Sequence, residues 1–128
     1  MEKKPKILLV DDDLDFIDAT KTILESKPYE VIVAYDGDEG LRKAREENPD
    51  LILLDIIMPV EDGFTTAEQL KKDPQLSKIP VIMLTSFSSR GQATSIPRSR
   101  GFSLEAEDYI EKPVSPEELL DRVQQYLK

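Results

Sequence analysis

Short aliphatic runs alternate along the chain with segments whose apolar residues recur every three or four positions. Runs typical of strands occupy residues 6–10, 29–35, 51–54, 81–84 and 109–110, the last being the shortest. Helical spacing of apolar residues predicts helices over residues 14–27, 64–72 and 115–127, and a short helix that ends before Pro49. The pattern therefore predicts five strands separated by helices.

Capping residues mark the ends of these helices. Asp13 is placed to cap the first helix, which we expect to end at Pro28, and Asp38 is expected to cap the second. The segment S-P-E-E that starts at Ser115 matches a capping box, with proline at the first helical position and glutamate at the third. Residues 86–105 are the stretch whose structure is hardest to predict, because glycine and proline interrupt any helix there, and we expect at most a short or irregular fourth helix.

The alternation of strands and helices predicts a doubly wound α/β fold. Parallel strands need crossover connections, so helices cover both faces of the sheet. The common order for five such strands is 2-1-3-4-5, with ligands bound beyond their carboxyl ends near the first and third strands. We therefore expect polar residues that follow the strands to meet at one rim.

Polar side chains do follow four of the predicted strands. They are Asp11, Asp12 and Asp13 after the first, Asp55 after the third, Thr85 after the fourth and Lys112 after the fifth. Each has a plain structural explanation when taken alone: a strand end or capped turn for the acids, a loop hydroxyl for the threonine, and a surface position for the lysine. Their joint occurrence at four strand ends favours a functional site.

Composition narrows the chemistry of such a site. The 128 residues suit one domain, and they include no cysteine and no histidine, which excludes disulfides, thiolate metal sites and imidazole chemistry. The net charge of −9 disfavours direct binding of nucleic acid. No apolar run approaches the roughly 18 residues of a membrane span, and the first residues lack the organisation of an export signal, so we expect a cytoplasmic protein.

Carboxylates grouped at one rim repel one another, so either the pKa of one of these carboxyl groups rises or the group binds a cation. Oxygen ligands favour Mg²⁺, and we expect Asp12 and Asp55 as direct ligands, with Asp11 acting through water. Lys112 supplies a positive charge and Thr85 a hydroxyl donor, both suited to a phosphoryl group. The Asp55 carboxylate can then attack in line and form an aspartyl phosphate.

Four motifs carry these residues: L-L-V-D-D-D at residues 8–13, D-I-I-M-P-V-E-D-G at 55–63, M-L-T-S at 83–86 and D-Y-I-E-K-P at 108–113. From residue 6 to residue 128, the chain resembles the receiver domain of two-component response regulators, with a flavodoxin-like fold. The resemblance implies a signalling domain rather than an enzyme. Its phosphoryl donor would be a sensor histidine kinase or phosphotransfer protein, and phosphorylation would change the surface offered to an unidentified downstream protein.

The resemblance also implies a role for each site residue. These roles are phosphoacceptor for Asp55, acidic pair for Mg²⁺ or Mn²⁺ for Asp11 and Asp12, main-chain carbonyl ligand for Ile57, switch pair for Thr85 and Tyr109, and phosphate binding for Lys112. It further implies a cis peptide bond between Lys112 and Pro113.

One segment departs from the family pattern. Where the family has an alanine after the switch hydroxyl and a regular fourth helix, this chain has Ser86, and Pro97 and Gly101 break the helix pattern. The resemblance implies that Ile57 and Phe87 occupy positions that flank the phosphoryl site and influence the attack of water on the acyl phosphate. Both are apolar here and offer no hydrogen bond to orient the water. We therefore expect slow self-dephosphorylation.

Two other functions fit parts of the sequence. The D-x-D pair of Asp11 and Asp13 suits a haloacid-dehalogenase-type phosphohydrolase with Asp11 as nucleophile, although this leaves the motif at Asp55 and the K-P motif unexplained. A docking module that is never phosphorylated is the third possibility.

We expect residues 1–128 to form a single receiver domain with a short tail over residues 1–5 and no output domain.

Overall fold

The five predicted strands form one parallel sheet. The computed structural model describes residues 4–55, 63–85, 108–112 and 114–127. The strands are β1 (Lys6–Val10), β2 (Glu30–Ala34), β3 (Leu51–Asp55), β4 (Val81–Thr85) and β5 (Asp108–Glu111), and their order is β2-β1-β3-β4-β5. This confirms the predicted order 2-1-3-4-5.

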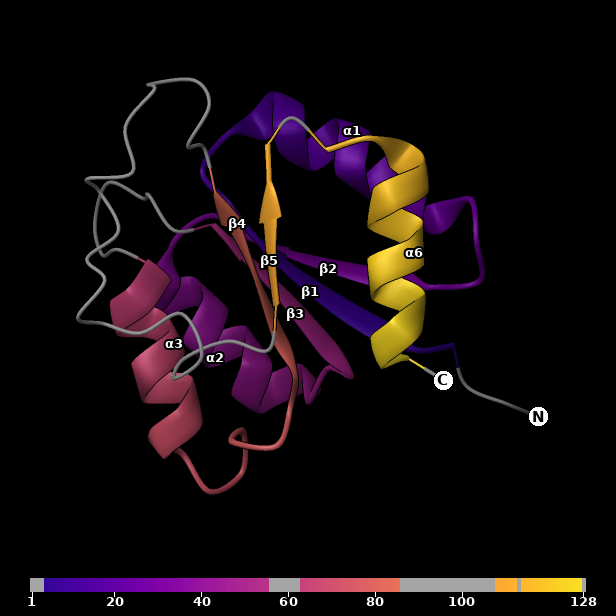
Figure 1. The fold of residues 1–128 in the computed structure, drawn as a ribbon. Helices are drawn as coiled ribbons and strands as arrows, with labels where there is room; N and C mark the ends of the chain where they lie inside the picture. Colours follow the sequence, from indigo (N-terminus) through magenta and orange to yellow (C-terminus); the bar gives the residue numbers. More distant parts are fainter. Residues whose placement is uncertain (1–3, 56–62, 86–107, 113, 128) are drawn as a thin grey trace.

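Helices cover both faces of the sheet, as expected for a doubly wound fold. The described helices are α1 (Leu14–Glu25), α2 (Gly37–Glu47), α3 (Gly63–Lys72) and α6 (Pro116–Tyr126). Helices α1 and α6 lie on one face of the sheet, and α2 and α3 lie on the other (Figure 1). The irregular fourth helix expected within residues 86–105 and the peptide bond to Pro113 lie outside the described residues.

The core has two parts, one on each face. Strands β3 and β4 are buried along their whole length, so their side chains alternate between the two parts. Leu8, Leu54 and Met83 belong to the part under α2 and α3, whereas Leu9, Leu53 and Leu84 belong to the part under α1 and α6. This alternation decides on which face each polar residue at the carboxyl rim lies.

Two of the three expected helix caps are confirmed. The Asp13 side chain accepts hydrogen bonds from the main-chain N–H groups of Asp15 and Phe16, and Ser115 accepts from Glu118. The prediction that Asp38 caps the second helix was wrong. Asp36 is the N-cap and accepts from the Glu39 N–H at 2.8 Å, so the helix already begins at Gly37.

The first helix is shorter than predicted. It ends at Glu25 with Ser26 as the C-cap, whose N–H donates to the carbonyls of Thr22 and Ile23. Pro28 therefore lies beyond the helix end and does not itself terminate the helix. Strand β3 extends one residue beyond the predicted run 51–54 and includes Asp55, and Pro49 lies outside α2 as predicted.

Candidate functional site

Three acidic side chains meet at the carboxyl ends of β1 and β3. These strands are neighbours in the sheet, with Val10 opposite Leu54, so Asp11 and Asp12 emerge beside Asp55. Carboxylate oxygens of Asp11, Asp12 and Asp55 all lie within 4.8 Å of one another. Asp11 and Asp55 are buried, whereas Asp12 is exposed to solvent. The predicted grouping of these residues is thus confirmed.

Lys112 brings a positive charge to the same cluster from the end of β5. Its ammonium nitrogen lies 2.8 Å from Asp11 Oδ2 and 3.5 Å from Asp55 Oδ1. Its main-chain N–H donates to the Thr85 carbonyl at 2.6 Å, which fixes the backbone against β4. Only 16% of its side chain is exposed, so the pairing takes place in a largely water-excluded environment.

An aromatic ring completes the surroundings of the Lys112 ammonium. The nitrogen lies 4.2 Å from the centroid of the Phe16 ring, within the range of a cation–π interaction. The apolar pattern predicted for residues 14–27 includes Phe16, but the pattern does not indicate this contact. Its place three residues after the N-cap Asp13 was the available signal, because a first-turn side chain lies close to the strand end that precedes it.

Burial and like charges raise the pKa of Asp55 to about 7. Burial is the largest cause and the neighbouring Asp11 adds to it, while Lys112 acts in the opposite direction. Burial also raises the pKa of Asp11 despite the hydrogen bond from Lys112. For Lys112, burial works to lower the pKa, but the contacts with Asp11 and Asp55 outweigh it, so the pKa lies above its usual value.

The cluster suits a hard divalent cation. Each of the three carboxylates offers one oxygen atom, and these oxygens lie within 4.8 Å of one another. Carboxylate oxygens are ligands that Mg²⁺ prefers. Two positive charges would offset the burial and the repulsion from Asp11, which together raise the pKa of Asp55. Ile57, expected to add a main-chain carbonyl, lies outside the described residues.

Asp11 and Asp13 already have structural contacts. Asp11 Oδ1 accepts the Asp13 N–H at 2.9 Å and its Oδ2 accepts Lys112, so both oxygens have partners. The Asp13 carboxylate caps α1. These contacts disfavour Asp11 as a nucleophile with Asp13 as its acid and base, which the phosphohydrolase alternative requires.

Thr85 and Tyr109 lie on the opposite face of the sheet from Lys112. Thr85 is buried at the end of β4, and alternation puts its side chain on the same face as that of Met83. Tyr109 pairs with Met83 in the sheet and packs against the core under α2 and α3. The two residues of the expected switch pair therefore share one face.

The sequence and the fold both match a known family. The family model described as the response regulator receiver domain matches residues 7–124. The chain belongs to the response regulator receiver domain family. The protein is accordingly a receiver domain of the two-component type, a signalling phosphoacceptor with an acidic cluster at its aspartate site.

Curated relatives of this receiver domain include longer regulators. The chain is 40% identical over 124 residues to the DNA-binding dual master transcriptional regulator RpaA of Synechocystis, covering 97% of this chain and 49% of RpaA. It is 39% identical to the alkaline phosphatase synthesis transcriptional regulatory protein PhoP of Bacillus subtilis, covering 96% and 48% of the two chains. The receiver domain thus spans about half the length of these relatives.

Solved structures share its fold over nearly their whole length. A putative response regulator from Chloroflexus aurantiacus superposes with a TM-score of 0.86 at 32% identity, covering 98% of each chain. The receiver domain of a sensor histidine kinase from Pseudomonas aeruginosa gives a TM-score of 0.83 at 28% identity, covering 96% of this chain and 97% of that one. That structure holds a magnesium ion coordinated in the active-site cleft.

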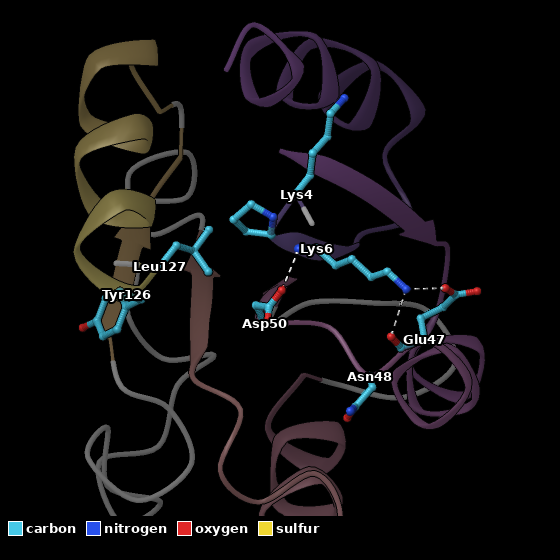
Figure 2. A pocket seen from close by; sticks show the side chains of 8 residues that line it. Lys4, Lys6, Glu47, Asn48, Asp50, Tyr126 and Leu127 are labelled. Carbon is cyan, nitrogen blue, oxygen red and sulfur yellow. Dashed lines mark hydrogen bonds and ion pairs between the residues drawn. The ribbon is translucent and has the colours of Figure 1, made fainter. Parts of the chain in front are cut away.

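The receiver domain also has a hollow of about 530 Å³ at the amino-terminal edge of the sheet. Figure 2 shows Lys6 reaching Glu47 across this hollow, with the Lys6 main-chain nitrogen bonded to Asp50. Tyr126 and Leu127 at the end of α6 line it as well. The contacts of Lys6 are with residues of the hollow itself, and they join β1 to the end of α2 and the start of β3.

No described helix has both the length and the apolar character needed to cross a membrane.

Proposed function

We propose that Asp55 is the phosphoacceptor of this receiver domain and that a sensor histidine kinase or a phosphotransfer protein supplies the phosphoryl group. The observation that carries the proposal is the position of Asp55, buried at the end of β3 with two further carboxylates within 4.8 Å and the Lys112 ammonium at 3.5 Å. In the transfer, a carboxylate oxygen of Asp55 forms the new bond to phosphorus while the phosphorus–nitrogen bond of the donor phosphohistidine breaks.

Asp11, Asp12 and Asp55 would hold Mg²⁺ or Mn²⁺, with the Ile57 carbonyl as a further ligand. The magnesium ion in the related receiver of the Pseudomonas kinase supports this assignment. When bound, the cation neutralises charge on the transferring phosphoryl group and on the carboxylates around it.

Lys112 and Thr85 would contact the phosphoryl oxygens. The Lys112 ammonium already lies between Asp11 and Asp55, so a small displacement toward Asp55 brings it to an oxygen of the phosphoryl group. The Thr85 hydroxyl donates from the neighbouring strand end. With both groups engaged, the charge that Asp55 gains is held by two adjacent strands.

Thr85 and Tyr109 would act as the switch pair that carries phosphorylation to a partner surface. They share the face of the sheet under α2 and α3, and Lys112 is joined to Thr85 through the main chain. Movement of the Thr85 hydroxyl toward the phosphoryl group would free space for the Tyr109 ring to turn inward. The downstream partner is a protein, and the net charge of −9 argues against direct contact of this domain with nucleic acid.

A phosphorylation assay with a small donor tests the assignment. Incubation with acetyl phosphate and Mg²⁺ should add one phosphoryl group, detected by intact-mass spectrometry, and Asp55→Asn should abolish the addition. Loss of labelling in Asp11→Asn, with labelling kept in Asp55→Asn, would instead support the phosphohydrolase. If wild type and both variants stay unlabelled and none binds beryllofluoride, the domain acts as a docking module.

Three expectations from the sequence stay predictions. They are a single domain over residues 1–128, a cytoplasmic location and slow self-dephosphorylation due to Ile57 and Phe87, both of which lie outside the described residues. The last is measured by phosphate release from the isolated phosphoprotein, and a lifetime of only seconds with Mg²⁺ would contradict it.

A further inference from the structure

We propose that Phe16 is a positioning residue for phosphoryl transfer, whose ring holds the Lys112 ammonium beside the Asp11 and Asp55 carboxylates. The proposal rests on the function of Asp55 proposed above and names a further residue of the same site. Phe16 does not reach the reacting atoms. It acts through Lys112.

The contact joins two elements that are distant in the sequence. Phe16 lies in the first turn of α1, and Lys112 follows β5. The ammonium lies 4.2 Å from the ring centroid, 2.8 Å from Asp11 Oδ2 and 3.5 Å from Asp55 Oδ1. The ring is half-buried and packs against the core under α1 and α6, so it cannot move away from the ammonium without losing apolar contacts.

The acidic motif itself fixes the ring. Asp13 Oδ1 accepts the Phe16 N–H at 3.2 Å, and the Asp13 carbonyl accepts the N–H of Ile17 at 3.0 Å. Ile17 is buried in the same core as the ring. The motif that supplies Asp11 and Asp12 to the cluster therefore also sets the first turn of α1 and the place of Phe16.

A ring face has a property here that a carboxylate lacks. It attracts the ammonium through its quadrupole without accepting a conventional hydrogen bond or cancelling the positive charge. The N–H groups of Lys112 can then exchange a carboxylate oxygen for a phosphoryl oxygen while the nitrogen stays in place. An aliphatic side chain of similar size would keep water out but would not hold the cation, and the ammonium would sample more positions before transfer.

Fluorinated phenylalanines at position 16 test this most directly, because fluorine weakens the ring quadrupole with little change of shape. Phosphorylation of the full chain by phosphoramidate is the readout, since a small donor removes any effect on partner docking. We expect the rate constant to fall stepwise with fluorination, by about 3- to 10-fold at full substitution. Phe16→Leu should lower the rate constant by a similar factor, whereas Phe16→Tyr, which keeps an aromatic ring, should keep the wild-type rate constant.

Two controls separate this inference from the function on which it rests. In a Lys112→Met background the fluorination series should become flat, because the cation is gone, and unfolding by urea should be alike across the series. A flat series in otherwise wild-type protein, with labelling still abolished by Asp55→Asn, would overturn the role of Phe16 alone. Absence of any labelling in the wild type would overturn the proposed function instead.

Discussion

At the residue scale, the site buries two neighbouring carboxyl groups whose negative charges repel each other. Asp11 and Asp55 are buried side by side with one ammonium between them, and the pKa of each carboxyl lies above its ordinary value. A second positive charge, from a metal ion, or removal of one negative charge would relieve the repulsion. Stability and function therefore oppose each other at Asp55.

Asp55→Asn should stabilise the metal-free protein at about pH 8. The folded-state pKa of Asp55 is about 7, against an ordinary 3.8, so the folded state binds more protons than the unfolded state between these values. Stability from this group falls as pH rises through that window, and the variant avoids the loss. We expect the free energy of unfolding to be about 2–4 kcal/mol higher in the variant at about pH 8.

Urea unfolding followed by circular dichroism in a chelating buffer measures this difference. The gap between the two proteins should shrink toward about pH 5, where Asp55 is protonated in the folded wild type. Asp18→Asn removes an exposed carboxylate from α1 and serves as the control, with little change at either pH. Equal stability of wild type and Asp55→Asn at about pH 8 would contradict the prediction.

Lys112→Met should increase the affinity for Mg²⁺. The ammonium lies 2.8 Å from Asp11 and 3.5 Å from Asp55, so it repels a divalent cation that binds the same oxygens. Calorimetric titration at about pH 8 should give a dissociation constant lower by about 3- to 10-fold, or roughly 1 kcal/mol. Lys43→Met is the matched control, because Lys43 pairs with Glu39 and with the Val33 carbonyl of β2. Weaker binding by Lys112→Met would show that the lysine organises the metal ligands.

At the element scale, α2 packs unusually closely on β1. A Cβ placed on Gly40 would meet Val10 Cγ2 at 3.0 Å and Cγ1 at 3.3 Å. Val10 immediately precedes Asp11, so this contact also helps set the strand end that carries the acidic cluster. The glycine thus allows the helix to approach the sheet at the site.

Gly40→Ala should destabilise the protein although alanine favours helices. Helix propensity alone would give about 1 kcal/mol of stabilisation, but the clash with a buried valine should outweigh it and leave a net loss of about 1 kcal/mol. Removing the clash with Val10→Ala should reverse the sign, so that Gly40→Ala stabilises in that background. Urea unfolding of the four proteins of this cycle tests the prediction, and additive effects would contradict it.

The same scale shows where apolar patterns mislead. Leu14 fits the helical spacing of α1, yet it is 66% exposed, whereas Phe16 and Ile17 of the same turn pack in or against the core under α1 and α6. The choice of Asp38 over Asp36 as N-cap was also wrong. Both are acids near the strand end, and the conformation of the turn, which the sequence pattern does not specify, decides which one caps.

At the scale of the whole molecule, periodicity predicted the elements, and the common order of doubly wound sheets then predicted the strand order and the rim. Aliphatic runs ending in polar residues identified Asp11, Asp55, Thr85 and Lys112, and the parallel topology forced them to one edge. The sequence brings Lys112 to the rim beside Asp11, but it does not predict which atoms pair or how closely the Lys112 ammonium approaches the Phe16 ring. Both depend on side-chain rotamers and on the tilt of α1, which no spacing rule encodes.

The sheet places the side chains of Lys112 and of the proposed switch residue Tyr109 on opposite faces. Lys112 shares the alternation of Ile110 and therefore belongs to the face under α1 and α6, whereas Tyr109 packs on the other face. The acidic cluster, through its contact with Lys112, and the proposed switch pair are thus joined at the ends of strands β4 and β5. The Lys112 N–H to Thr85 carbonyl bond is one direct link between them.

Mg²⁺ should stabilise the whole domain through the acidic cluster. A ligand that binds only the folded state raises the free energy of unfolding by about 1.4 kcal/mol at ten times its dissociation constant. In wild type this gain should appear as a higher urea midpoint with an unchanged slope, followed by circular dichroism because the chain has no tryptophan. Asp12→Asn and Asp55→Asn should each lose most of the gain, since each removes a carboxylate of the cluster. Asp50→Asn, at the opposite edge of the sheet, should keep it. Equal stabilisation of all four proteins would place the metal outside the cluster.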